Sequence, residues 1–494
     1  MSDRVAARWP LLVAAAAALA AAPAVGNGFT LDDVAQVRDN PAIRSLANVP
    51  TLFTRPYWDL PGEQHGLYRP VTVASFAVNR AATGASPAGF HAVDVGLHAL
   101  VAALAWFAFR RAGTVYGTAL FGGLVFATHP VHVEAFANVS GRSELLAAAG
   151  VLAAWLAHRK GRPAIAAGLW LLAVLSKESA ILAPALFALD DALRPDGERP
   201  RRPWPAYAVA MAAALALRWN ALGGLRGAES AIFLDNPAAT AGSAARAATA
   251  LWCQGIHLGL FLWPQRLVSD YSFDALPVVR SLSDPRAWAG ILFALALVAA
   301  CVAAWRRRSR PVVLALAAWA LFFLPSSNLL FASGTILAER QAYLPSLGAC
   351  LLVGHTAAAA ARATGRRSLV AAAVVALSFA LAARGFARIP AWKDNLTLAT
   401  TDAAAQPRSA KLQAGAGMFL EEAGRDTEAE AALARAVAIW PDYAQARYNL
   451  AVLLARRGAR EEAIEHLERV VALSPANPRP YALLERLKRG QVGG

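Results

Sequence analysis

The chain has 494 residues, of which 57% are hydrophobic and 16% charged, and its mean hydropathy is +0.39. A globular domain usually carries about 25% charged residues, so this composition excludes a disordered chain, a coiled coil and an ordinary soluble enzyme, and it requires a membrane protein over most of the length. The net charge of +15 comes from short basic runs between apolar segments, which is typical of cytoplasmic loops and not of nucleic-acid binding.

Eleven apolar segments predict membrane-spanning helices. The first, residues 9–25, follows two arginines and is interpreted as an uncleaved helix; a signal peptide cleaved near Ala22-Pro23-Ala24 is the alternative. The other ten are predicted at 91–109, 114–130, 143–158, 163–177, 178–190, 205–219, 288–305, 311–325, 341–361 and 368–385.

The basic runs orient these spans. With the N-terminus in the cytoplasm, the basic runs between spans lie inside and every large polar loop lies outside. This arrangement requires that the apolar stretch 247–263 does not cross once, so we expect it to dip into the membrane and return, or to lie on its surface. Any chemistry is therefore expected on the extracytoplasmic side.

Asp32 and Asp33 follow the first span directly. Two carboxylates at a membrane surface repel each other, so one of them should hold a proton more tightly, which suits a general base working near neutral pH. Acidic residues in the first turn of a helix are the alternative interpretation.

Further charged and histidine side chains are predicted on the same face of the membrane. They are Arg69, His129, His132, Glu134, Arg142, Lys177, Glu178, Glu339 and Arg340. Charges in or beside spans are functional candidates, and the four cations among them suit a phosphate-bearing lipid headgroup. The alternatives are ion pairs at tight turns and, at the two histidines, a metal site for which no further ligand is evident. The three cysteines have no ligand spacing.

Three prolines, Pro407, Pro441 and Pro475, recur every 34 residues near the C-terminus. Aligned on them, small and apolar residues coincide, which is the tetratricopeptide pattern. Full repeats are predicted at 408–441 and 442–475, and partial ones at 392–406 and 478–488. The chain thus divides into a membrane domain, 1–390, and a repeat domain, 391–490. The repeats predict a solenoid whose concave face binds an extended protein segment; packing on the membrane domain or self-association is the alternative.

The motifs occur in a fixed order along the chain. They are Asp32-Asp33, Tyr68-Arg69-Pro70, His129-Pro130-Val131-His132-Val133-Glu134, Gly141-Arg142-Ser143-Glu144, Lys177-Glu178, Asp235-Asn236-Pro237-Ala238, Glu339-Arg340-Gln341-Ala342-Tyr343-Leu344-Pro345 and the terminal repeats. This set resembles the transmembrane and tetratricopeptide-repeat-containing family of protein O-mannosyltransferases, within the GT-C glycosyltransferase fold. The resemblance covers nearly the whole chain. It implies an all-α fold, in which a GT-C-like bundle of about eleven spans precedes a short solenoid.

The resemblance also implies an activity. A sugar, mannose in that family, would pass from a polyprenyl-phosphate donor in the bilayer to Ser or Thr hydroxyls of extracytoplasmic proteins held by the repeats, with inversion at the anomeric carbon. The base maps onto Asp32 or Asp33. The groups expected to bind donor phosphate or substrate are Arg340 and Lys177, then Arg142 and Arg69, with His129, His132, Glu134 and Glu339.

Several expectations accompany this activity. No cofactor is expected besides the lipid-linked sugar, and a requirement for a divalent metal is left open. The Ala- and Arg-rich composition is typical of a bacterium with GC-rich DNA, which would place the chain in the inner membrane. Two other functions remain as alternatives: a non-catalytic membrane scaffold whose repeats recruit envelope proteins, and a transporter of lipid-linked sugars.

Overall fold

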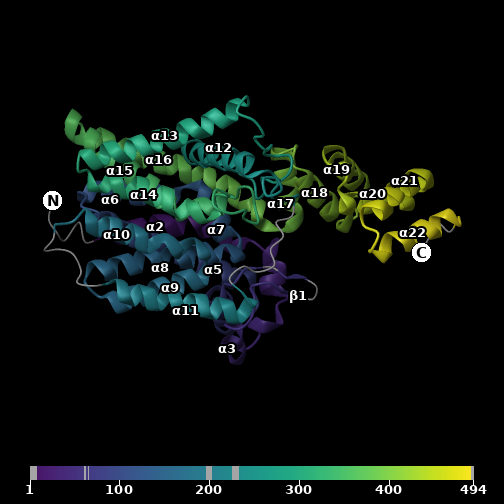
Figure 1. Ribbon diagram of the computed structural model, residues 1–494, viewed down its shortest axis with the longest axis horizontal. Helices are drawn as coiled ribbons and strands as arrows, with labels where there is room; N and C mark the ends of the chain where they lie inside the picture. Colours follow the sequence, from purple (N-terminus) through teal and green to yellow (C-terminus); the bar gives the residue numbers. More distant parts are fainter. Residues whose placement is uncertain (1–7, 61–62, 65, 196–202, 225–232, 491–494) are drawn as a thin grey trace.

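The computed structural model describes residues 8–60, 63–64, 66–195, 203–224 and 233–490. Within these ranges the regular elements are helices, apart from one hairpin of two-residue strands, β1 (Asp59–Leu60) and β2 (Glu63–Gln64). Figure 1 shows a bundle of long helices lying along the long axis of the molecule and a slimmer arm of short helices that projects from one end. The prediction of an all-α fold is confirmed.

In the described residues, fifteen helices form the bundle and the segments packed against it (Figure 1). They are α2 (Trp9–Ala21), α3 (Val49–Leu52), α4 (Pro70–Thr83), α5 (Pro87–Arg111), α6 (Tyr116–Thr128), α7 (Val133–Ala137), α8 (Arg142–Arg159), α9 (Pro163–Ser176), α10 (Ala183–Ala192), α11 (Trp204–Leu222), α12 (Ser243–Leu262), α13 (Pro285–Arg306), α14 (Arg310–Phe323), α15 (Ser346–Thr364) and α16 (Arg367–Arg388). Short 3₁₀ turns join several of them and carry His132, Glu178, Glu339 and Arg340.

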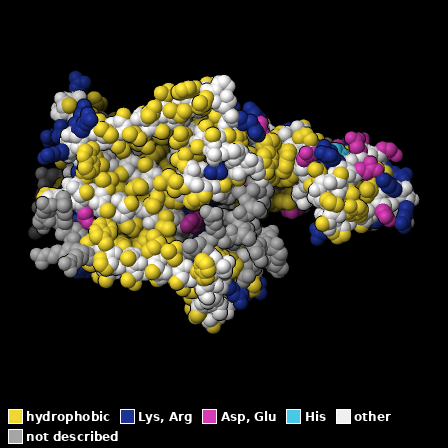
Figure 2. Space-filling model, viewed as in Figure 1, with side chains coloured by type: hydrophobic (Ala, Val, Ile, Leu, Met, Phe, Trp, Pro, Cys, Tyr) yellow, Lys and Arg dark blue, Asp and Glu magenta, His cyan; other side chains and the backbone are white. Residues whose placement is uncertain are grey.

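Four helices in the described residues are long and apolar enough to cross a membrane. They comprise Trp9–Gly26, Pro87–Arg111, Pro285–Arg306 and Arg367–Lys393. Tyr116–Thr128, Pro163–Ser176 and Arg310–Ser326 are apolar but shorter than the roughly 20 residues that a straight crossing needs. Figure 2 shows a broad apolar surface over the bundle, which suits contact with lipid. The number and order of the eleven spans stay a prediction.

Small residues let the helices of the bundle approach closely. A Cβ on Gly354 of α15 would lie 2.3 Å from the carbonyl oxygen of Thr118, and one on Gly122 of α6 would lie 2.6 Å from that of Cys350. Backbone thus contacts backbone where α6 crosses α15, as is common between helices in membranes.

The projecting arm is a stack of antiparallel helix pairs, as the 34-residue period predicts. Its helices are α17 (Asn395–Ala405), α18 (Ala410–Glu422), α19 (Asp426–Ile439), α20 (Ala444–Arg457), α21 (Arg460–Leu473) and α22 (Pro478–Lys488). The aligned residues Ala429, Leu433, Ala463 and Leu467 are all fully buried in one hydrophobic cluster. Small residues at these positions therefore pack each helix pair against the next.

Side chains of the bundle hold the foot of this solenoid, its first helix α17 and the residues just before it, in place. Arg388, at the end of α16, donates two hydrogen bonds to the carboxylate of Asp402 in α17, at 2.6 and 3.0 Å. Asp402 also accepts a bond from the backbone N–H of Ser269 at 2.6 Å. The ring of Trp440 lies 5.6 Å from that of Phe233 and 6.0 Å from that of Phe273. The solenoid is thus fixed to the end of α16 and to the loops on both sides of α12.

Both flanks of α12 lie on the solenoid side of the bundle. Lys411 of α18 contacts Asp235, which precedes α12, at 2.5 Å, and Asp270, which follows it, at 3.6 Å. Arg384, near the end of α16, donates to the carbonyl of Pro264 directly after α12. The segments on both sides of α12 thus meet at Lys411, and the expectation that residues 247–263 dip into the membrane or lie on its surface stays a prediction.

Candidate functional site

The two adjacent aspartates have different environments. Asp33 is fully buried; its carboxylate accepts bonds from the backbone N–H groups of Val139 at 3.0 Å and Ser140 at 2.6 Å. Burial raises the pKa of Asp33 to about 7, although these bonds act in the opposite direction. Asp32 is exposed. Only Asp32 is accessible to a substrate, and Asp33 holds the turn Val139–Gly141 against the first loop.

The loop that carries Asp32 is also bonded to the foot of the solenoid. The backbone N–H of Leu31 donates to Oδ1 of Asn395 at 2.8 Å, and that of Gly28 donates to the carbonyl of Lys393 at 2.8 Å. A Cβ on Gly28 would lie 2.9 Å from the same carbonyl oxygen, so a larger residue would force these two segments of the chain apart. Residues 28–33 are therefore held on both sides.

Three cations that the sequence singled out are each paired with a glutamate. Arg69 donates to Glu178 through Nε at 3.0 Å and Nη2 at 2.5 Å. Lys177 pairs with Glu144, and both are buried. Arg340 pairs through its side chain with Glu134, which also accepts the backbone N–H of Arg340 at 2.8 Å. At 32% exposure, the Arg340 side chain is more open than those of Arg69, 13%, and Lys177, 9%.

Electrostatic coupling unites these pairs in one cluster. The carboxylates of Glu134, Asp32 and Glu144 raise the pKa of Arg340. The charge of Glu144 also favours the charged form of Arg69, whose guanidinium lies over the ring of Tyr57 at 5.3 Å. Asp32 is therefore within electrostatic range of Arg340, and Glu144, the partner of Lys177, acts on both Arg340 and Arg69.

Arg142 and the two histidines do not join this cluster. Arg142 is fully buried; it donates to Asp94 at 2.5 Å, to Oδ1 of Asn79 at 2.7 Å and to the carbonyl of Phe90 at 3.0 Å. His129 stacks on Phe261 with its Nε2 2.8 Å from the Phe261 carbonyl oxygen. These contacts tie helices together and leave Arg142 no exposed surface for a donor phosphate.

The second histidine has similar surroundings. His132 is fully buried, with Nδ1 3.0 Å from the carbonyl oxygen of Phe126 and Nε2 2.8 Å from Oγ of Ser346. Burial lowers the pKa of His132, so the ring is neutral. Among the residues that the structure describes, no group of three or more His, Cys, Asp or Glu side chains is arranged to hold a metal ion.

Glu339 lies beside the cluster and makes a separate set of hydrogen bonds. Its Oε1 accepts the backbone N–H of Val268 at 2.6 Å and the hydroxyl of Tyr271 at 2.7 Å. Burial raises the pKa of Glu339 to about 8, and the charge of Glu134 adds to the effect. Glu339 thus anchors the loop after α12, and it is neutral over most of the physiological pH range.

This raised pKa predicts a pH-dependent stability. Because the folded-state pKa of about 8 exceeds the ordinary value of 4.5, the folded protein binds the extra proton, and this contribution to stability is lost as the pH rises from about 4.5 to about 8. In Glu339→Gln, which keeps an acceptor oxygen for both bonds, we expect a flatter dependence of the thermal midpoint on pH. Thermal unfolding at several pH values measures it. Glu428→Gln, at an exposed position, is the control. Equal slopes of the thermal midpoint against pH in the unaltered protein and in both variants would exclude Glu339 as the source of this pH dependence.

Two site residues were not found from the sequence. Lys411 lies on the first solenoid helix, and its side chain is 43% exposed between Asp235 and Asp270. Although burial opposes the charge, the carboxylates of Asp270, Asp235 and Asp32 raise the pKa of Lys411. A surface lysine in a repeat carries no distinguishing pattern, and only the Asp235-Asn236-Pro237-Ala238 motif pointed to this region. Tyr57 was missed because a tyrosine in a long loop has no specific spacing.

Comparisons with known proteins identify relatives of this chain. Residues 231–298 match the family described as "Protein O-mannosyl-transferase TMTC, DUF1736", and residues 402–487 match the tetratricopeptide repeat. The human protein O-mannosyl-transferase TMTC3 is 27% identical over 91% of this chain, human TMTC4 is 28% identical over 85%, and Tmtc3 of Drosophila melanogaster is 28% identical over 86%. In turn, the aligned parts cover 53%, 65% and 54% of these three relatives. This chain therefore spans between about half and two thirds of their length.

Proposed function

Because this membrane chain is related over most of its length to the TMTC protein O-mannosyl-transferases, we propose that it is a glycosyltransferase that adds a sugar, mannose by this relationship, to Ser or Thr hydroxyls of proteins. The donor is a polyprenyl-phosphate sugar. The observation that supports this most directly is an exposed carboxylate, Asp32, within electrostatic range of the partly exposed guanidinium of Arg340, in a loop that is hydrogen-bonded to the first residues of the solenoid.

The proposed reaction is a single displacement with inversion. Asp32 accepts the proton of the acceptor hydroxyl while the hydroxyl oxygen forms a bond to the anomeric carbon. The bond from that carbon to the phosphate oxygen breaks on the opposite side, and its electron pair leaves with the lipid phosphate. Arg340 faces the negative charge that develops there, which lowers the barrier.

The remaining residues position this pair. Arg69 and Lys177 are each held by a glutamate, so each presents a fixed ion pair rather than a free charge. Asp33 holds the loop of Asp32 against the turn Val139–Gly141. Arg142, His129 and His132, which the sequence suggested as binding residues, are assigned to helix packing, and Glu339 to the support of the loop after α12.

The proposal includes a location for each partner. The donor lipid stays in the bilayer with its sugar phosphate at the solenoid end, which we place on the extracytoplasmic side of a bacterial inner membrane because the basic runs then face the cytoplasm. The acceptor protein reaches the same end along the solenoid. Figure 1 supports a common end, since the arm projects from the side of the bundle where the first loop lies.

Transfer in a purified system tests the proposal. The full-length protein is reconstituted into vesicles with a polyprenyl-phosphate mannose and a Ser- and Thr-containing protein segment, with magnesium or with a chelator. Mass spectrometry should find a hexose added to a hydroxyl residue of the acceptor. Movement of the labelled lipid sugar between leaflets without any transfer would favour the transporter, and acceptor binding without either would favour the scaffold.

The solenoid should act on acceptor affinity and not on chemistry. The partly exposed side chains of Tyr448 and Asn449 lie on α20, two helices beyond Lys411 of α18. In a Tyr448→Ala, Asn449→Ala variant we expect KM for a long acceptor segment to rise several-fold while kcat and the KM for a short peptide stay unchanged. Initial rates at varied acceptor concentration measure this, with exposed Glu485→Ala on α22 as the control. A fall in kcat alone would contradict a holding role.

A further inference from the structure

Glu134 is a buried glutamate on α7 that takes no part in the proton transfer proposed for Asp32. Its side chain is 1% exposed, and both of its carboxylate oxygens are used on one residue. Oε2 accepts the backbone N–H of Arg340 at 2.8 Å, and Oε1 accepts Nη1 of the same arginine. Glu134 therefore holds Arg340 by its backbone and by its side chain at once, which restricts the guanidinium more than a side-chain contact alone.

This contact leaves one edge of the Arg340 guanidinium without a protein partner. Within the described part of the chain, Nη1 donates to Glu134, whereas Nε and Nη2 donate no hydrogen bond. Nε and Nη2 form the edge with which an arginine binds a carboxylate or a phosphate through two parallel bonds. Arg69 uses both nitrogens on Glu178, and Arg142 uses both inside the bundle. Of these three arginines, Arg340 keeps the edge available, and its side chain is 32% exposed.

Other contacts hold the segment that follows Arg340. Nε2 of His132 lies 2.8 Å from Oγ of Ser346, and Nδ1 of His98 lies 2.8 Å from the hydroxyl of Tyr343. Both histidines are buried in the bundle. These contacts do not involve the glutamate, so its replacement should leave this segment folded and release the guanidinium.

We propose that Glu134 is a positioning residue for sugar transfer, which holds Arg340 so that its Nε–Nη2 edge meets the phosphate of the donor. This inference rests on the proposed function. A guanidinium that is already fixed stabilises the charge on the leaving phosphate without being ordered during the reaction. The carboxylate lies beyond Nη1, farther from that phosphate than the guanidinium is, so the attraction by Arg340 outweighs the repulsion by Glu134.

Hexose transfer by the full-length protein in vesicles, at varied concentrations of polyprenyl-phosphate mannose, tests this role. Glu134→Gln keeps the size of the side chain and one acceptor oxygen, so it loosens Arg340 without leaving an empty space. A misplaced group of this kind should lower kcat by about 10- to 100-fold. KM for the donor should change much less, because the contact strengthens as the charge develops. An unaltered kcat in Glu134→Gln would overturn the proposal.

A double-mutant cycle shows whether Glu134 acts through Arg340. In Arg340→Gln the guanidinium is absent, so the further change Glu134→Gln should alter kcat by no more than about twofold. The matched pair is Arg69 with Glu178, and the losses in Glu178→Gln and Arg340→Gln should multiply. If the losses in Glu134→Gln and Arg340→Gln multiply as well, Glu134 does not position Arg340. An unaltered protein that transfers no hexose would refute the proposed function itself.

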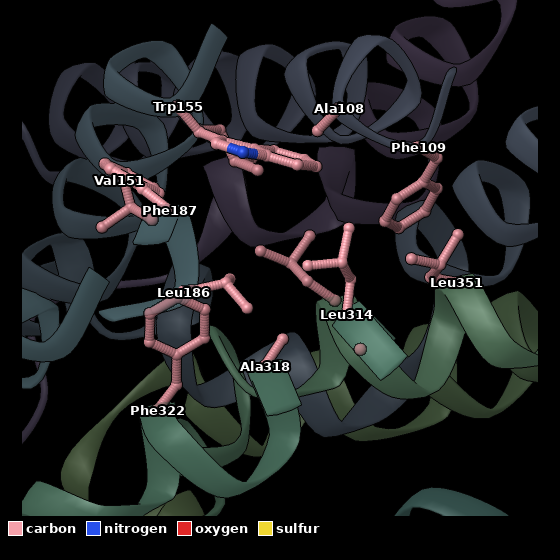
Figure 3. Close-up of a pocket in the computed structure, with 13 residues that line it drawn as sticks. Ala108, Phe109, Val151, Trp155, Leu186, Phe187, Leu314, Ala318, Phe322 and Leu351 are labelled. Carbon is pink, nitrogen blue, oxygen red and sulfur yellow. The ribbon is translucent and has the colours of Figure 1, made fainter. Parts of the chain in front are cut away.

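A variant remote from Arg340 separates loss of stability from loss of position. An apolar cavity of about 40 Å³ lies between α8, α10 and α14, and Figure 3 shows its lining, which includes Leu186 and Phe322 and none of the candidate site residues. Leu186→Ala enlarges this cavity, so it should lower the unfolding midpoint. Its kcat per folded molecule should equal that of the unaltered protein. An equal fall of kcat in Leu186→Ala and Glu134→Gln would mean that weakened packing, and not the orientation of Arg340, lowers the rate.

Discussion

Replacing Asp32 with Asn should reduce sugar transfer by roughly 10²- to 10⁴-fold and leave the protein folded. The amide cannot accept the proton of an acceptor hydroxyl, whereas the size of the side chain is unchanged. Because Asp32 is exposed, its charge is not needed for packing. Initial rates of hexose transfer in vesicles measure the effect, and thermal unfolding checks the fold.

Two further variants separate the base from its neighbours. Asp39→Asn removes another exposed carboxylate of the same loop, which pairs with the adjacent Arg38 at 2.9 Å, and should transfer sugar normally. Asp33→Asn replaces one of the two oxygens that each accept a backbone N–H by an NH2 group, which cannot accept, so it should lower the unfolding midpoint as well as the rate. Transfer at the unaltered rate in Asp32→Asn would refute the assignment of the base.

Replacing Arg142 with Met should destabilise the membrane domain by about 3–5 kcal/mol, the usual cost of breaking a buried ion pair by removing one partner. Asp94 would then remain charged or take up a proton inside the bundle, and the carbonyl of Phe90 and the amide of Asn79 would lose their donor. Thermal unfolding in detergent measures the loss.

A second substitution tests the cause of this loss. In Arg142→Met combined with Asp94→Leu no carboxyl is left without its partner, so part of the stability should return. Arg38→Met, which removes one member of an exposed pair, should be nearly neutral. An equal loss in the single and double variants would show that the volume of the arginine matters and its charge does not.

The arrangement of the helices could be predicted much more completely than the arrangement of the site. Apolar segments and the proline period depend on residues close in sequence, and they indicated the bundle and the solenoid. The division of labour between Asp32 and Asp33 depends on a turn at Val139–Gly141, more than 100 residues away, so two adjacent carboxylates could not be told apart.

Ion-pair partners were missed for the same reason. The partner of Arg142 is Asp94, 48 residues earlier and within an apolar helix, and that of Arg340 is Glu134, 206 residues away. The sequence identified all four cations and placed Arg340 and Lys177 before Arg142 and Arg69, but it carried no information on which of them are buried. Burial distinguishes them, since Arg142 is enclosed and Arg340 is partly exposed.

The bond between Leu31 and Asn395 joins positions 364 residues apart, and Gly28 is tied in the same way to Lys393. The segment that presents Asp32 thus follows the first helix of the bundle and is hydrogen-bonded to the beginning of the solenoid. A shortened protein that stops before Lys393 would keep its apolar helices, but the segment that carries Asp32 would lose these two hydrogen bonds. Binding of an acceptor protein to the solenoid would act on the position of Asp32 through the same bonds.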